Sequence, residues 1–119
     1  MSLQVFAGMR VREFAPARQW YERLLGEPSF FPHATEAVWT LAEGGSVYVV
    51  EDAGRAGQGV VTLLVDDLDA HVAEIAARGG LDPDERLTYS NGVRKAVYRD
   101  PDGNELEVAG VPAAAAEPG

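Results

Sequence analysis

The feature that most constrains the fold of this chain is an internal repeat. A strand-like segment that runs into an acidic turn, Met9–Phe14, returns 54 residues later as Leu63–Leu68. Each copy is followed by apolar residues at helical spacing, and each helical pattern ends at glycine, which commonly stops a helix. Because one such unit is too small to bury a sheet by itself, the repeat predicts two similar modules that share one core.

The two expected helices cover residues 16–25 and 69–78. Pro16 suits a first helical turn, where its missing N–H costs nothing. At the second helix, either Asp67 or Asp69 can cap the free N–H groups.

Three short strands are expected after each helix, separated by turns rich in glycine. Gly44-Gly45, Asn91-Gly92 and Asp100–Gly103 are typical hairpin sequences. An offset of 58 residues aligns the last strands of the two halves, because it places Gly44-Gly45 opposite Asp102-Gly103. The expected strands are 29–31, 37–41 and 46–50 in the first half, and 86–90, 94–99 and 105–108 in the second.

Charge and composition exclude several classes of protein. The net charge of −9 disfavours binding to nucleic acid, whose phosphates repel an acidic surface. The 119 residues contain no cysteine, which excludes disulfides and thiolate metal sites. No apolar run approaches the roughly 20 residues that span a bilayer, and the N-terminus has no signal-peptide pattern. We therefore expect a cytoplasmic protein that does not bind membranes.

Three segments resemble the motifs of the vicinal oxygen chelate superfamily, which includes glyoxalases, bleomycin-resistance proteins and extradiol dioxygenases. These segments are Arg10–Gly26, Val65–Ala70 and Tyr98–Glu107, and the resemblance spans about residues 4–108. It implies an α+β fold of two βαβββ modules, whose curved mixed sheets lie around a cleft with the helices outside. It also implies a homodimer. We expect one domain at 1–110, with modules at about 3–51 and 59–109, and a flexible tail at 111–119.

The resemblance also indicates where a metal would be held. Enzymes of this superfamily present His or Glu from the first and last strands of each module, which correspond here to Phe6, Val49, Val60 and Glu107. A catalytic zinc needs about three protein ligands, and only Glu107 can serve as one. We therefore expect no metal site and no cofactor, and we expect the two histidines, His33 and His71, to be solvated.

Strand alternation predicts an apolar pocket with one acidic member, in which Phe6, Val49 and Val60 surround Glu107. Glu107 could pair with Arg10 or Lys95, or it could accept a proton or bind an amine. Arg10 could hold an anion or neutralise Glu107. Trp39 could stack on a planar ligand, although a tryptophan in a strand more often packs in the core.

Three functions are consistent with this sequence. The first is metal-free binding of a small molecule, cationic or aromatic, in order to sequester a drug or metabolite. The alternative is a lyase- or dioxygenase-like enzyme that uses Glu107 as a tentative catalytic base or an unrecognised metal site. The third is a non-catalytic module whose surface contacts a protein partner.

Overall fold

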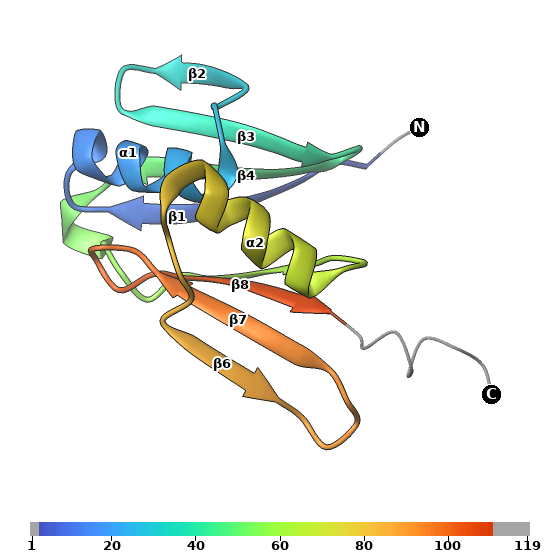
Figure 1. Ribbon diagram of the computed structural model, residues 1–119. Coiled ribbons are helices and arrows are strands. Elements are labelled where there is room, and N and C mark those ends of the chain that lie inside the picture. The colour runs from blue at the N-terminus through green and yellow to red at the C-terminus, as the bar shows by residue number, and fades with distance from the viewer. Residues whose placement is uncertain (1–2, 111–119) are drawn as a thin grey trace.

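A computed structural model describes residues 3–110 of the chain. The expected flexible tail at 111–119 lies outside the described residues. The described chain forms two helices, one short 3-10 turn and eight strands in two sheets (Figure 1). In chain order these are β1 (Val5–Val11), α1 (Phe14–Leu25), β2 (Phe30–His33), β3 (Glu36–Ala42), β4 (Gly45–Glu51), η1 (Ala53–Arg55), β5 (Val60–Leu64), α2 (Leu68–Gly79), β6 (Glu85–Thr88), β7 (Arg94–Arg99) and β8 (Glu105–Gly110).

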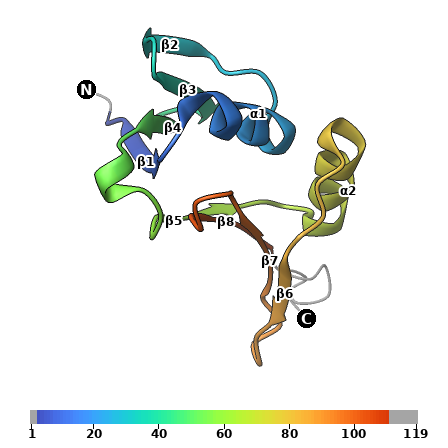
Figure 2. The ribbon, with the colours of Figure 1, turned by 90° about the vertical axis from the view of Figure 1, so that its left-hand side faces the viewer.

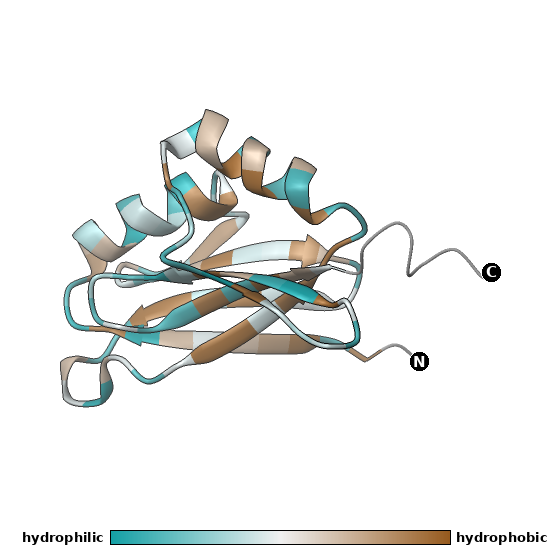
Figure 3. Cartoon of the chain, turned by 60° about the horizontal axis from the view of Figure 1, so that its bottom comes forward, coloured by the Kyte–Doolittle hydropathy of each residue, from teal (hydrophilic) through white to brown (hydrophobic). Residues whose placement is uncertain are grey.

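The fold is α+β and consists of two βαβββ modules, as predicted. The sheet orders are β1-β4-β3-β2 and β5-β8-β7-β6, so each sheet places its first strand beside its last. β1 pairs parallel with β4, and β5 pairs parallel with β8, whereas the remaining pairs are antiparallel. The two sheets do not close into a barrel, and both helices lie on the same side of them (Figures 2 and 3). No helix of the described part is long and apolar enough to cross a membrane.

The helices begin and end close to the predicted residues. α2 is capped by Asp67, whose carboxylate accepts a hydrogen bond from the Ala70 N–H at 3.0 Å. α1 begins at Phe14, two residues earlier than predicted, because the Phe14 N–H donates to the carboxylate of Glu51 at 3.0 Å. Glu51 ends β4, so this cap comes from a residue that is distant in sequence. Both helices stop at glycines with positive φ, Gly26 at 90° and Gly80 at 70°.

One hydrophobic core joins the two modules. The inward faces of both sheets and both helices contribute fully buried residues, and α1 contacts α2 directly. Among the largest of the buried side chains are Trp39, Tyr21, Tyr98, Met9, Leu24, Ile75 and Leu106. Figure 3 shows the helices lying across the strands, with hydrophobic stretches in both.

The turn between β7 and β8 links the modules through hydrogen bonds that are buried or partly buried. The Tyr21 hydroxyl of α1 donates to the Asp100 carboxylate at 2.8 Å, and burial together with this carboxylate raises the pKa of Tyr21. The Asn104 amide donates to the carbonyl of Arg10 at 2.8 Å, and its oxygen accepts from the Gly59 N–H at 2.8 Å. The turn at 100–104 therefore fixes the end of β1 and the start of β5 relative to each other.

Candidate functional site

Each sheet presents one face that the helices do not cover. On β1, alternation places Phe6, Gly8 and Arg10 on this side, while Met9 and Val11 are fully buried beneath the helices. The register adds Ser46, Tyr48 and Val50 of β4 to the same side. We call this surface open face one, and it consists of Phe6, Gly8, Arg10, Ser46, Tyr48 and Val50.

The second module repeats this arrangement. Residues Val60, Thr62 and Leu64 of β5 lie in register with Glu105, Glu107 and Ala109 of β8. We call these six residues open face two. Phe6 is 51% exposed and Val60 is 61% exposed, so a single chain leaves apolar side chains of both open faces in contact with solvent. Phe6, Arg10, Val60 and Glu107 lie on the strand faces that alternation assigns to them, and their role in binding a ligand stays a prediction.

Tyr48 lies over Gly8 on open face one. A Cβ atom added at Gly8 would overlap the ring of Tyr48, so a side chain at position 8 requires this ring to move. Val38 of β3 is in register with Tyr48, and Phe30 of β2 is in register with Val38. This row continues the apolar surface of Tyr48 onto the neighbouring strands, where Val38 is buried and Phe30 is half exposed.

Open face two is charged, and its charges are paired. The Glu107 carboxylate accepts hydrogen bonds from the Lys95 ammonium and the Thr62 hydroxyl, both at 2.9 Å. The hydrogen bond from Lys95 is the main reason that the pKa of Glu107 lies below its ordinary value, and the same bond raises the pKa of Lys95. Glu107 is therefore an ionised group whose charge is compensated. Of the roles considered for it, the structure shows the pairing with Lys95.

A second charged group lies beside this pair. Arg99 of β7 donates from Nε to Glu105 at 3.0 Å and from Nη2 to Glu85 at 2.6 Å. The hydrogen bonds from both glutamates raise the pKa of Arg99. Because these groups are partly exposed, their pairing orders the surface more than it stabilises the fold.

Two expected pocket residues lie on the wrong side of their strands. Val49 is fully buried and Trp39 is 1% exposed, and both belong to the core beneath the helices. The Trp39 indole N–H donates to the carbonyl of Gly26 at 2.8 Å, so Trp39 has a structural partner at the end of α1. The placement of Val49 in the open pocket and of Trp39 as a stacking surface is therefore wrong, and the core alternative for Trp39 is confirmed.

The error at Val49 is one of register. Phe6 pairs with Ser46 and Val60 pairs with Glu105, so equivalent positions of the last strands are 59 residues apart rather than 58. The counterpart of Glu107 is therefore Tyr48. The backbone shows the same offset, because Gly44 and Gly103 both have positive φ, at 76° and 94°. Matching Gly44 with Gly103 in the sequence would have identified Tyr48.

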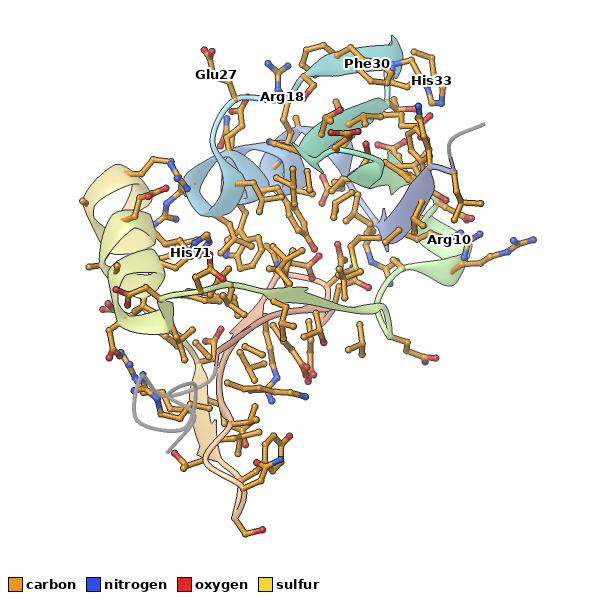
Figure 4. The ribbon with its side chains drawn as sticks, turned by 90° about the vertical axis from the view of Figure 1, so that its right-hand side faces the viewer. Arg10, Arg18, Glu27, Phe30, His33 and His71 are labelled. Atoms are coloured by element: carbon orange, nitrogen blue, oxygen red, sulfur yellow. The ribbon has the colours of Figure 1, made fainter. Side chains whose placement is uncertain are left out.

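The remaining polar candidates do not meet Glu107. Arg10 approaches Asp52, with 3.4 Å between Nε and Oδ2. His33 on β2 lies 3.1 Å from Glu36, and His71 lies on α2 at the other side of the molecule (Figure 4). The suggestion that Arg10 neutralises Glu107 is therefore wrong.

Comparison with known proteins gives the family. The protein-family model described as glyoxalase-like domain matches residues 6–109 of this chain. This chain belongs to the glyoxalase-like domain family. Its motifs and fold also place it in the vicinal oxygen chelate superfamily.

Several solved structures resemble this glyoxalase-like domain. A glyoxalase/bleomycin resistance protein from Catenulispora acidiphila is 49% identical, with a TM-score of 0.87, over 93% of this chain and 100% of that one. A bleomycin resistance determinant encoded on transposon Tn5 is 19% identical, with a TM-score of 0.72, over 93% and 99%. A lactoylglutathione lyase from Agrobacterium tumefaciens is 20% identical, with a TM-score of 0.70, over 92% and 94%. The last two matches support the fold alone. No match was found among curated proteins.

The residues of this glyoxalase-like domain do not fit a metal held in the manner of the superfamily. With the register corrected, the four relevant positions are Phe6, Tyr48, Val60 and Glu107. Only Glu107 is a carboxylate, and Lys95 and Thr62 already occupy one of its oxygens. Within residues 3–110, no three His, Asp or Glu side chains come together in a way that could hold a metal ion.

Proposed function

We propose that this protein binds an aromatic small molecule on its open faces and sequesters it without a metal. One observation carries the proposal: the positions that would hold a metal present Phe6, Tyr48 and Val60 together with an ion-paired Glu107. An apolar surface with a few fixed polar groups is the usual composition of a small-molecule site. The resemblance to proteins described as bleomycin resistance proteins supports the same kind of function.

The two faces favour different parts of one ligand. Phe6 and Tyr48 provide aromatic surface, on which a planar ring can pack face-on or edge-on. Open face two offers Thr62 and the paired charges of Glu107 and Lys95. Because Lys95 compensates Glu107, the acidic group attracts a cation less than an isolated carboxylate would. The aromatic character of the expected ligand is therefore better supported than a cationic one.

A second copy of the chain would complete the site. In one chain the open faces are exposed, and a ligand there would be covered on one side only. A homodimer that brings open face one of one protomer near open face two of its partner would surround the ligand and bury Phe6, Val60 and Leu64. We include this homodimer in the proposal.

The alternative, a lyase- or dioxygenase-like enzyme with Glu107 as its base, has less support. A useful general base has a pKa near the working pH, whereas the hydrogen bond from Lys95 lowers the pKa of Glu107. An activity that is lost in Glu107→Gln, with the fold retained, would favour this alternative.

A binding screen tests the proposed function. Neutral and charged aromatic compounds are titrated into the protein and followed by melting temperature and by ¹H–¹⁵N NMR shifts at Phe6 and Tyr48. We expect at least one class of aromatic compound to bind. Phe6→Gln and Tyr48→Gln should each weaken this binding about tenfold or more, since each substitution removes about 1.5–3 kcal/mol of apolar contact.

Phe31→Gln is the matched control. Phe31 is also exposed, but Arg18 lies 4.5 Å above its ring and it is outside the two open faces. Phe31→Gln should bind like the unmodified protein. A screen in which no compound shifts either readout, or in which all three variants bind equally, would contradict the proposal.

A further inference from the structure

A polar hollow of about 430 Å³ lies at the edge of open face one. It is bounded by Gly8 and Arg10 of β1 and by the segment that connects the modules, residues 54–59. Figure 4 shows Arg10 beside this connecting segment. The ring of Tyr48 lies over Gly8, so the hollow adjoins the aromatic surface of open face one.

The charged side chains that line the hollow are both arginines, although the protein as a whole is acidic. Arg10 and Arg55 line it, and both approach the same carboxylate of Asp52, at 3.4 and 3.9 Å. Two guanidinium groups thus share one negative charge, which leaves an excess of one positive charge, whereas the whole chain has a net charge of −9. The two arginine side chains are 49% and 71% exposed. Exposed pairs at these distances contribute little stability, so either arginine can turn to another anion at low cost.

The backbone around the hollow is held in an unusual conformation. Gln58 has φ of 69°, which makes it the one non-glycine residue of the described chain in the left-handed region. Its two neighbours are fixed, because the Gly57 N–H donates to the carbonyl of Arg10 and the Gly59 N–H donates to the Asn104 side chain. Such strained residues persist where the surroundings over-determine them, and they cluster at ligand sites.

Two arginine side chains supply the donors of the hollow. Four of its eight lining residues are glycines, but protein atoms fill the space of a Cβ atom at Gly8, Gly57 and Gly59, so among these four Gly54 alone leaves its main chain open on that side. The guanidinium groups are planar forks of N–H donors whose geometry matches the two oxygens of a carboxylate.

From these observations we infer that the hollow binds the carboxylate of an aromatic acid whose ring packs on Tyr48, with Arg10 and Arg55 as the anion-binding residues. This inference rests on the proposed function for the position of the ring, and it narrows the ligand class from aromatic compounds to aromatic carboxylates. The bound carboxylate would replace or join Asp52 as the partner of the two arginines.

Titration with benzoate and with its neutral analogue benzamide, at constant ionic strength, tests the inference. NMR shifts of Gly57, Gln58 and Gly59 report on the hollow, and those of Phe6 and Tyr48 report on open face one. We expect benzoate to shift both sets with one saturable curve and benzamide to bind at least tenfold more weakly. Arg55→Gln should weaken the binding of benzoate roughly tenfold or more, because it removes hydrogen bonds to a charged group, and should leave the binding of benzamide unchanged.

Arg86→Gln is the matched control, because Arg86 is an exposed arginine of β6 outside the hollow. The inference would be overturned if benzoate and benzamide bind equally well, or if Arg55→Gln and Arg86→Gln weaken the binding of benzoate equally.

A titration with inorganic phosphate separates this inference from the proposed function. If no aromatic compound shifts Phe6 or Tyr48, the proposed function fails. In that case, phosphate would still support an anion-binding hollow if it shifts the NMR signals of Gly57, Gln58 and Gly59 in a saturable way and these shifts are lost in Arg55→Gln.

Discussion

At the scale of single residues, the most informative group is Glu107. Its place in the predicted pocket suggested a base or an amine-binding group, but its carboxylate accepts hydrogen bonds from Lys95 and Thr62. A carboxylate that is 8% exposed must have such partners, because burying an unpaired charge is costly. The chemistry available to Glu107 is thus set by two side chains on neighbouring strands.

This pairing predicts a pH dependence of stability. Because the folded state lowers the pKa of Glu107, its contribution is present above the ordinary pKa of 4.5 and is lost as the pH falls through the folded value. We expect Glu107→Gln to be about 1–2 kcal/mol less stable than the unmodified protein at pH 7, and this difference to shrink below pH 4.5.

Urea unfolding between pH 3 and 7 measures the difference. Glu43→Gln is the control, since Glu43 is exposed, and its effect should stay within about 0.5 kcal/mol. A gap for Glu107→Gln that is constant across this pH range would contradict the assigned ion pair.

At the scale of elements, the close contact between β1 and β4 shapes open face one. The ring of Tyr48 can lie over β1 because Gly8 has no side chain. Gly8 does not have a positive φ, so steric room rather than backbone conformation requires glycine at this position. The aromatic surface of the proposed site thus depends on a residue without a side chain.

Gly8→Ala should destabilise the protein by about 1–3 kcal/mol, since the new methyl group would overlap the ring of Tyr48. In a Tyr48→Ala background the same change should be neutral or stabilising by about 0.5 kcal/mol, because alanine loses less backbone entropy than glycine. Urea unfolding of the four proteins gives the coupling between the two positions. The same cost in both backgrounds would show that Tyr48 does not lie over Gly8.

At the scale of the whole molecule, the shared core joins the two modules, whereas the open faces leave apolar side chains exposed to solvent. The helices and the inward sheet faces form one core, so the two modules should fold as one unit. The opposite faces leave Phe6 and Val60 at least half exposed, along with Leu64, which is 79% exposed. Large apolar side chains that are exposed on these faces would be buried if the faces form an interaction site.

Val60→Arg should therefore convert the proposed homodimer to a monomer and leave the fold intact, because this side chain is 61% exposed in the single chain. A charge buried at the centre of an interface without a partner is strongly unfavourable. Light scattering measures the mass, and Ala77→Arg on the exposed side of α2 is the control. Equal masses for all three proteins would exclude open face two from the interface.

Much of the fold could be predicted from local chemistry. The repeat, the glycines that stop both helices, the Asp67 cap and the turns at 91–92 and 100–103 depend on residues close in sequence. Strand alternation also assigned the faces of β1 and β5 correctly, because it needs no knowledge of the partner strand.

The residues that were misplaced depend on contacts between distant segments. A one-residue error in offset moves a side chain to the other face of its strand, which is why Val49 was predicted in the pocket and Tyr48 was missed. The N-terminal cap of α1 by Glu51, the pairing of Lys95 with Glu107 and the contact of Arg10 with Asp52 join residues that no local pattern connects. The sequence by itself thus determined the modules and their turns, whereas only the tertiary structure decided which side chains meet on the open faces, because register and pairing are set across strands.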